Sequence, residues 1–394
     1  MTKVADPRLR DKPVPRISVA QMERDHVARE SRMVGSRLAF LDQRLPGHER
    51  ENISVIGLGV TENVTDPNLA PKIAAGAHGF AVGYIRAENG KGAALHRHPT
   101  EEIFTPIRGD WEIYWLDGEA ERSVKLAPGD IVNVPVGIYR GFRGASDTPD
   151  ALLFAAVGGP DPGKVDWHPS VIDAARRTGL AVDSAGNLLD GAAAASDKAT
   201  VETVDDRLRG KPVPKISREA MEKTSVARIA AMKGSAVAFV DQRIPGHERE
   251  IIDVVGMGVT ENSSDPDLAP KIATPAHGFA VTYIRAKKGK GAALHRHPTE
   301  EVFTPIKGTW EVFWMEGDTE RAAALEPGDI VNVPIGIYRG FRNVSDHPEA
   351  LLLAFIGGPD PGKVDWHPKV IADARATGLE VDDEGNLIVA AAAQ

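Results

Sequence analysis

One stretch of this 394-residue chain occurs twice, almost unchanged, and no other feature constrains the fold as strongly. The run 90–109 returns as the run 289–308, which is a spacing of 199 residues. Repeats that stack into solenoids are far shorter, whereas a unit of this length is itself the size of a domain. The sequence therefore predicts a duplicated domain, with one copy at 1–190, a small and polar linker at 191–204, and a second copy at 205–394.

Each copy of this stretch carries two histidines one residue apart and a glutamate four residues after the second histidine. Successive side chains of a strand point to opposite faces, so His96 and His98 share one face. Pro99 and Thr100 can turn the chain and bring Glu102 back beside them. Imidazole and carboxylate groups are good ligands for divalent transition metals, and a polar cluster without metal is the alternative. The candidate metal ligands are His96, His98 and Glu102, and in the second copy His295, His297 and Glu301.

Short apolar segments punctuated by glycine and proline surround both motifs. Many short strands with closely spaced turn signals are typical of a β-sandwich or β-barrel. We therefore expect a mostly β fold, with two tandem barrels and short flanking helices. The strands expected in the first copy are 53–60, 79–86, 93–98, 103–107, 111–116, 131–134 and 151–157, and the helices expected in the two copies are 18–31, 170–178, 217–230 and 369–377.

These motifs resemble those of the cupin superfamily. The run 90–109 matches the first cupin motif, G-x5-H-x-H-x3-E-x6-G, at every fixed position. The run that begins at Gly129 is similar to the second motif, G-x5-P-x-G-x2-H-x3-N. The resemblance implies a bicupin, with two tandem germin-like cupin domains that are jelly-roll β-barrels. One position departs from the family pattern, because the His expected as a fourth metal ligand is Arg140 here and Arg339 in the second copy.

Arg140 leaves two interpretations open. Two histidines and one carboxylate can still hold non-haem iron with open positions for substrate and oxygen, and Arg140 would then bind the acid group of an anionic substrate bidentately. Alternatively, no metal is bound and Arg140 pairs with Glu102, since an unpaired buried charge is very costly. Under the first interpretation Arg140 and Arg339 are substrate-binding residues.

Several other side chains are candidates for the site or for the core. His78 and His277 begin the strand before the histidine pair and are candidate accessory ligands or proton donors, with a structural position at the barrel rim as the alternative. We expect Trp167 to dock the helix that follows it. Strand alternation allows four further residues either to wall a cavity or to fill the core, namely Phe104, Trp111, Ile113 and Trp115.

Composition excludes several classes of function. A hydrophobic content of 42% and a charged content of 26% describe a soluble globular protein. The net charge of -9, without a basic stripe, argues against nucleic-acid binding. No run reaches the length of a membrane span, and the first residues lack the apolar segment of a signal peptide, so the cytoplasm is expected. The absence of cysteine excludes disulfides and cysteine-based zinc sites.

Two functions from different classes fit these observations. The first is a metal-dependent enzyme, with iron or manganese favoured and nickel or zinc as alternatives. The resemblance implies an oxidoreductase, a dioxygenase of the cupin kind that acts on a small organic acid, aromatic or not, although cupin isomerases, decarboxylases and lyases share the scaffold. The second is a metal-free binding module or a storage-type bicupin. The expected partner is a small anionic molecule, with neither nucleic acid nor membrane as a partner and a homo-oligomer left open.

Overall fold

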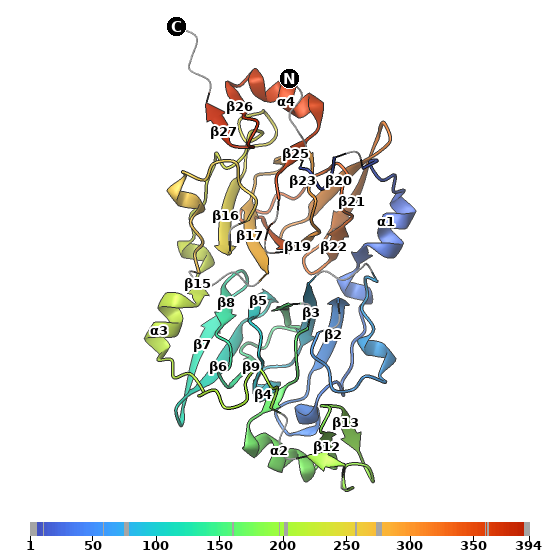
Figure 1. Ribbon diagram of the computed structural model, residues 1–394, viewed down its shortest axis with the longest axis vertical. Helices are drawn as coiled ribbons and strands as arrows, with labels where there is room; N and C mark the ends of the chain where they lie inside the picture. The colour runs from blue at the N-terminus through green and yellow to red at the C-terminus, as the bar shows by residue number, and fades with distance from the viewer. Residues whose placement is uncertain are drawn as a thin grey trace. The chain divides into compact units, whose positions relative to one another are not determined.

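The computed structural model describes residues 6–10, 12–57, 59–74, 79–159, 161–196, 198–200, 204–256, 258–272, 278–358, 360 and 362–389. The chain forms two compact units, each built around an antiparallel jelly-roll barrel (Figure 1), which confirms the predicted fold class. The N-terminal barrel belongs to the unit Arg32–Ile229. The C-terminal barrel belongs to the unit that joins Met1–Ser31 to Ala230–Gln394.

The N-terminal barrel consists of two facing sheets. One sheet has the strand order β15-β8-β5-β10-β3-β2 and the other has the order β11-β4-β9-β6-β7. The strands are β2 (Glu51–Ile56), β3 (Phe80–Arg86), β4 (Gly92–Arg97), β5 (Glu102–Arg108), β6 (Trp111–Asp117), β7 (Ala120–Leu126), β8 (Ile131–Val134), β9 (Arg140–Gly144), β10 (Leu152–Gly158), β11 (Asp166–Trp167) and β15 (Val226–Ala227).

The C-terminal barrel repeats this topology strand for strand. Its sheets have the orders β1-β22-β19-β24-β17-β16 and β21-β20-β23-β18-β25. The strands are β1 (Val27–Ala28), β16 (Glu250–Val255), β17 (Phe279–Arg285), β18 (Gly291–Arg296), β19 (Glu301–Lys307), β20 (Trp310–Glu316), β21 (Thr319–Leu325), β22 (Ile330–Val333), β23 (Arg339–Asn343), β24 (Leu351–Gly357) and β25 (Asp365–Trp366).

The leading segments of the two sequence repeats are exchanged between the units. Strand β1 comes from the first repeat but pairs with β22, and β15 comes from the second repeat but pairs with β8. The compact units therefore differ from the predicted domains, 1–190 and 205–394, which follow the sequence repeat. Strand pairing and burial, rather than repetition of the sequence, decide to which unit a leading segment belongs.

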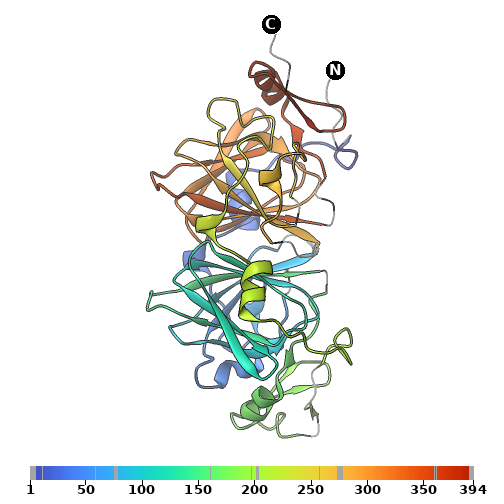
Figure 2. The same cartoon turned by 90° about the vertical axis from the view of Figure 1, so that its left-hand side faces the viewer.

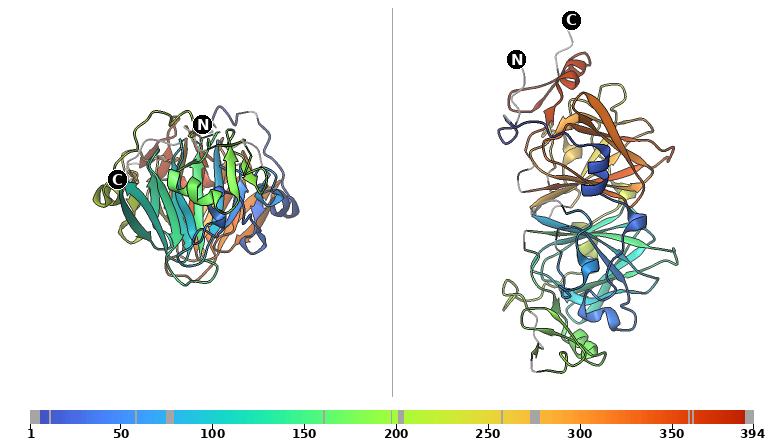
Figure 3. Two further views of the ribbon diagram at one scale, coloured as in Figure 1. Left: turned by 90° about the horizontal axis from the view of Figure 1, so that it is seen from below. Right: turned by 90° about the vertical axis from the view of Figure 1, so that its right-hand side faces the viewer.

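Each leading segment contains a short helix that ends earlier than expected. Helix α1 (Val19–Asp25) begins after Ser18, whose hydroxyl accepts from the amide of Gln21 in a capping box. It stops at Asp25 because the next residues form β1, so the predicted helix 18–31 is too long. Helix α3 (Arg218–Thr224) begins after Ser217, whose hydroxyl accepts from the amide of Ala220, but alanine at this position cannot complete a capping box. Figure 2 shows α3 beside the N-terminal barrel, and the right panel of Figure 3 shows α1 against the C-terminal barrel.

One further α-helix follows the strands of each barrel. Helix α2 (Pro169–Arg176) is capped by the imidazole of His168, and Pro169 occupies its first turn, where no amide hydrogen is needed. Its buried residues, Val171 and Ile172 among them, share an apolar cluster with Trp167, as expected for a residue that docks the helix. The remaining elements are α4 (Pro368–Arg375), β12 (Leu180–Asp183), β13 (Leu188–Asp190), β14 (Ala199–Thr200), β26 (Leu379–Val381) and β27 (Leu387–Val389).

Besides the two-residue strands β11 and β15, two longer strands of the N-terminal barrel were not expected from the sequence. Strand β7 has few buried side chains because it is an edge strand, and β9 contains two glycines and two arginines, so both lack the apolar alternation that identifies a strand. Strand β9 nevertheless places Arg140 in the barrel.

No helix in the described part of the chain is long and apolar enough to cross a membrane.

Candidate metal centre

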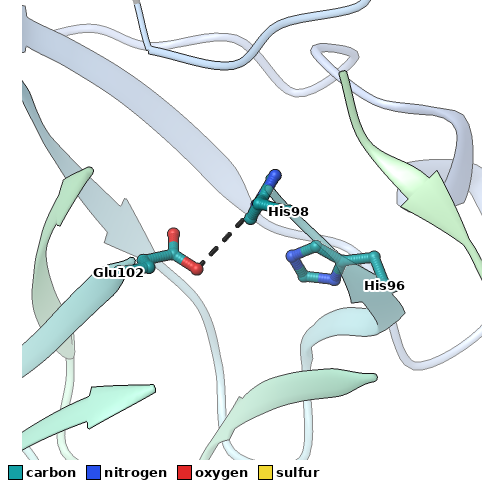
Figure 4. A group of neighbouring side chains, drawn as sticks. All are labelled: His96, His98 and Glu102. Carbon is teal, nitrogen blue, oxygen red and sulfur yellow. Dashed lines mark ion pairs between the residues drawn. The ribbon is translucent and has the colours of Figure 1, made fainter. Parts of the chain in front are cut away.

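The two predicted histidines and the predicted glutamate of the N-terminal copy converge inside its barrel (Figure 4). His96 lies on β4, His98 lies just beyond its end, and Glu102 begins β5. One donor atom of each residue lies within 4.8 Å of the others, and all three side chains are buried. Nε2 of His98 is 3.9 Å from Oε2 of Glu102. The alternation expected for a strand therefore holds, since both imidazoles reach the same interior.

The hydrogen bonds and burial of the imidazoles suit them to bind a cation. Nδ1 of His96 lies 2.7 Å from the carbonyl oxygen of Ala94, which requires a proton on Nδ1 and leaves the Nε2 lone pair free. Burial, reinforced by the Arg140 charge, holds the pKa of His96 and of His98 well below the usual value. Both rings are therefore neutral at pH 7, which is the form that coordinates metals.

Arg140 is bonded to the glutamate of this cluster. Strands β4 and β9 place Arg140 directly opposite His96, so its side chain enters the same interior. Its Nη2 donates to Oε2 of Glu102 over 2.6 Å, and its Nη1 donates to the carbonyl oxygen of His96. Burial raises the pKa of Glu102, and the adjacent Arg140 guanidinium opposes that rise. This close pair favours the charged form of the carboxylate and fixes its orientation.

The C-terminal barrel reproduces the arrangement. His295, His297 and Glu301 are buried, with donor atoms within 4.8 Å of one another. Nδ1 of His295 bonds the carbonyl oxygen of Ala293, and Arg339 forms an ion pair with Glu301. Burial and the Arg339 charge again hold the pKa of both histidines well below the usual value. Both copies thus retain the donors and the arginine that is bonded to them.

The donors line a cavity in each barrel, of about 100 Å³ in the N-terminal barrel and about 40 Å³ in the C-terminal one. Around the N-terminal donors the walls are largely apolar and include Phe40, Phe142 and Trp167. Among the described residues that line this cavity, one side chain is cationic, namely that of Arg50, which forms a buried ion pair with Asp42. Arg50 could not be assigned to the site from the sequence, because its charged surroundings, Pro46 to Glu51, are typical of a solvated turn.

Trp167 supports the cavity wall as well as helix α2. Its ring lies 5.3 Å from the ring of His96, and its Nε1 donates over 2.6 Å to the buried carboxyl of Glu62. Burial raises the pKa of Glu62 to about 8. Trp366 and Glu261 form the same hydrogen bond in the other barrel. Trp167 therefore links the site to the fold, because it contacts the ring of His96 and also packs against helix α2.

Other candidates from the sequence lie elsewhere. His78 and His277 fall outside the described residues. Phe104, Trp111, Ile113 and Trp115 belong to an apolar core cluster. Among the residues that the structure describes, neither they nor Arg140 line the N-terminal cavity. The pairing of Arg140 with Glu102, expected only for a barrel without metal, thus coexists with three convergent donors.

The donor set fits a divalent transition metal. Two neutral imidazoles and one carboxylate, all buried and facing one another, are typical ligands of non-haem iron and related ions. The hydrogen bond from Nδ1 of His96 to the main chain is the outer-shell contact that orients a ligating histidine. Nδ1 of His98 has no hydrogen-bond partner in the described part of the chain.

Comparison with known proteins places both sites in matched regions. A family model described as Cupin domain matches residues 83–157 and again residues 282–356, which include both donor sets and both arginines. No curated protein matches the chain. An oxalate decarboxylase of Lactobacillus farciminis is similar in structure, with a TM-score of 0.49 and 14% identity over 96% of this chain and 98% of that chain. The vicilin of Solanum lycopersicum has a TM-score of 0.48 and 11% identity over 86% and 87%.

Proposed function

Since the chain is a bicupin, with two cupin domains in tandem, we propose that it is a divalent-metal-dependent enzyme with one active site in each barrel. The observation that carries the proposal is the buried set of two neutral histidines and one carboxylate, present in both barrels. His96, His98 and Glu102 would hold one ion, and His295, His297 and Glu301 the other. A metal bound by such a set supplies redox chemistry with positions open for a substrate and for dioxygen. We therefore propose a dioxygenase.

The charges around the site favour an anionic substrate. The imidazoles are neutral, Arg140 cancels the charge of Glu102, and Asp42 cancels that of Arg50. The protein groups at the site therefore sum to about zero, and a bound divalent cation would be left without a neutralising charge. A substrate carboxylate would supply it. Arg140 thus contributes to acid binding by neutralising Glu102, whereas direct contact with the acid would require it to release Glu102.

The cavity volume limits the substrate to a small acid. A protein cavity of roughly 150 Å³ can bind benzene. The N-terminal cavity, at about 100 Å³, is smaller, which favours an aliphatic acid over an aromatic one. Among the described residues that line the cavity, each charged side chain already has a partner of opposite charge. The substrate class we propose is therefore a short aliphatic carboxylic acid.

Metal analysis of freshly purified protein, followed by oxygen-uptake measurements, tests this function. We expect about two iron or manganese ions per chain, and oxygen uptake with small aliphatic acids that disappears when His96→Ala and His295→Ala are combined. Protein that neither contains nor takes up iron, manganese, nickel or zinc would contradict the proposal. If the protein binds metal but takes up no oxygen, the proposal of a metal-dependent enzyme stands, and the chemistry would be that of an isomerase, decarboxylase or lyase.

A metal-free binding or storage protein is the second candidate function. It is favoured by the Arg140–Glu102 ion pair, which already neutralises the buried carboxylate without a cation. In such a protein the cavity would take a small ligand and transform nothing. The same metal analysis separates the two candidate functions. A binding or storage protein should take up no metal at the two sites, at any metal concentration below that of nonspecific binding.

A further inference from the structure

The two cavities differ in size although they share one set of walls around the donors. Each described residue that lines the C-terminal cavity has a counterpart, 199 residues earlier, that lines the N-terminal one. Most pairs are identical in sequence, including the donors and both arginines, Arg50 and Arg249. The pairs that differ, each given with its N-terminal member first, are Asn52 and Ile251, Gly83 and Thr282, and Val157 and Ile356.

The exchange of glycine for threonine accompanies a second exchange on the neighbouring strand. Thr282 on β17 lies directly opposite Asp253 on β16, and its Oγ1 donates to Oδ1 of Asp253 over 2.9 Å. Both side chains are buried. A Cβ atom placed on Gly258 would lie 2.9 Å from Oγ1 of Thr282 and 3.0 Å from Oδ1 of Asp253. The pair therefore fills the space in front of Gly258.

The same space is open in the N-terminal barrel. Ser54 lies opposite Gly83 in the equivalent register, so neither side chain extends as far as its counterpart. A Cβ atom placed on Gly59 would meet no atom nearer than Cβ of Ala81, at 3.8 Å. The N-terminal cavity extends into this space, and we call the extension the side chamber, lined by Ser54, Gly59, Leu69, Ala81 and Gly83.

We propose that Asp253 and Thr282 form a plug that makes the two sites selective for acids of different length. With the side chamber open, the N-terminal site would take an acid that carries a short aliphatic chain, since the chamber is apolar except for the Ser54 hydroxyl. With the plug in place, the C-terminal cavity of about 40 Å³ has room for only about three water-sized groups, at roughly 10–15 Å³ each. That site would take only the shortest acids. The inference rests on the proposed function for its ligand class.

Binding of acetate, propionate and butyrate to manganese-loaded protein tests the selectivity. His295→Ala leaves the N-terminal site intact and His96→Ala leaves the C-terminal site intact, so calorimetry can measure each site alone. We expect the affinity of the N-terminal site to rise about fourfold with each added methylene group, as for burial of one CH₂. The affinity of the C-terminal site should fall along the series. Equal trends at the two sites would overturn the proposal.

Exchange of the plug residues provides the matched variants. Asp253→Ser with Thr282→Gly, in the His96→Ala background, should give the C-terminal site the preference of the N-terminal one. Ser54→Asp with Gly83→Thr, in the His295→Ala background, should give the N-terminal site the preference of the C-terminal one. A Cβ at position 83 would lie 2.8 Å from the carbonyl oxygen of Ile53, so the backbone must shift slightly to accept threonine. The other barrel accommodates a threonine, Thr282, at the equivalent position. Preferences that stay unchanged in both variants would rule out the plug.

A crystal structure of the Asp253→Ser, Thr282→Gly variant separates this inference from the proposed function. It requires neither metal nor acid. The C-terminal cavity should widen in front of Gly258 toward the volume of the N-terminal one. If the cavity stays closed, the plug is wrong whatever the metal content. If the cavity opens while no acid binds at either site, the plug stands and the proposed function fails.

Discussion

Nη2 of Arg140 donates to Oε2 of Glu102 over 2.6 Å, with both side chains buried beside two neutral imidazoles. Arg140 occupies the position at which the cupin pattern has a fourth metal ligand. Where that pattern has a ligand, this chain has a guanidinium group that binds one of the candidate ligands. Because Arg339 is paired with Glu301 in the same way, the replacement is a property of both sites.

Removing one histidine from each donor set should abolish metal binding. We expect His96→Ala with His295→Ala to bind no manganese or iron, and each single variant to bind about half as much as the parent, because the barrels hold separate donor sets. Metal content is measured on dialysed protein. His168→Ala is the control, since His168 caps helix α2 and should leave metal content unchanged. A single His96→Ala variant that binds as much metal as the parent would disprove the ligand assignment.

Restoring the family residue should tighten metal binding. Arg140→His with Arg339→His removes a positive charge next to each donor set and adds an imidazole to it. We expect metal affinity, measured by competition with a chelator, to rise at least tenfold. Arg140→Ala is the comparison: without metal it leaves the Glu102 carboxylate buried and unpaired, which should lower the free energy of unfolding by about 3–5 kcal/mol. No gain in affinity from the histidine would mean that the donors do not converge on a metal.

The plug should make the stability of the C-terminal barrel depend on pH. Burial raises the pKa of Asp253 from 3.8 to about 6. The folded barrel therefore keeps a proton that the unfolded chain releases, and the free energy of unfolding should fall as the pH rises from about 4 to about 6. The loss amounts to about 3 kcal/mol.

Asp253→Asn isolates this contribution. The variant should lose that part of the pH dependence, because an amide does not titrate, whereas Ser54→Ala in the other barrel should keep it. Denaturant unfolding at a series of pH values provides the measurement. A parent protein and an Asp253→Asn variant with parallel pH profiles between about 4 and 6 would contradict the raised pKa.

Met22, near the start of the chain, should stabilise the C-terminal barrel. Met22 on α1 is fully buried in the apolar core of the C-terminal barrel. Met22→Ala should lower the free energy of unfolding of that barrel by about 2–5 kcal/mol. Hydrogen exchange should show lost protection in β19 and β24 but not in β5 and β10. Met221→Ala, in the equivalent position of α3, should give the opposite pattern. Lost protection in β5 and β10 after Met22→Ala would refute the exchange of segments.

Local sequence was sufficient for most of the strands and for the candidate donors. The alternation of His96 on β4 and His98 just beyond its end placed both side chains on the interior face, and the turn after them brought Glu102 alongside. These relationships depend on residues within a few positions of one another, so the period-two geometry of a strand determines them. The mostly β fold and the family of the domains could be predicted for the same reason. Strand β9 could not, since its arginines and glycines show no such period.

Contacts between distant segments required the tertiary structure. Val27–Ala28 and Val226–Ala227 are the same dipeptide, so local sequence contains nothing that assigns one to β22 and the other to β8. Likewise, the sequence left Arg140 with two possible partners, and only the register of β4 with β9 brings it to Glu102. The plug depends on Asp253 and Thr282, which are 29 residues apart in sequence, meeting across the paired strands β16 and β17. The sequence alone determined the donors of the site and the fold around them, whereas long-range strand pairing decided which charge and which volume surround those donors.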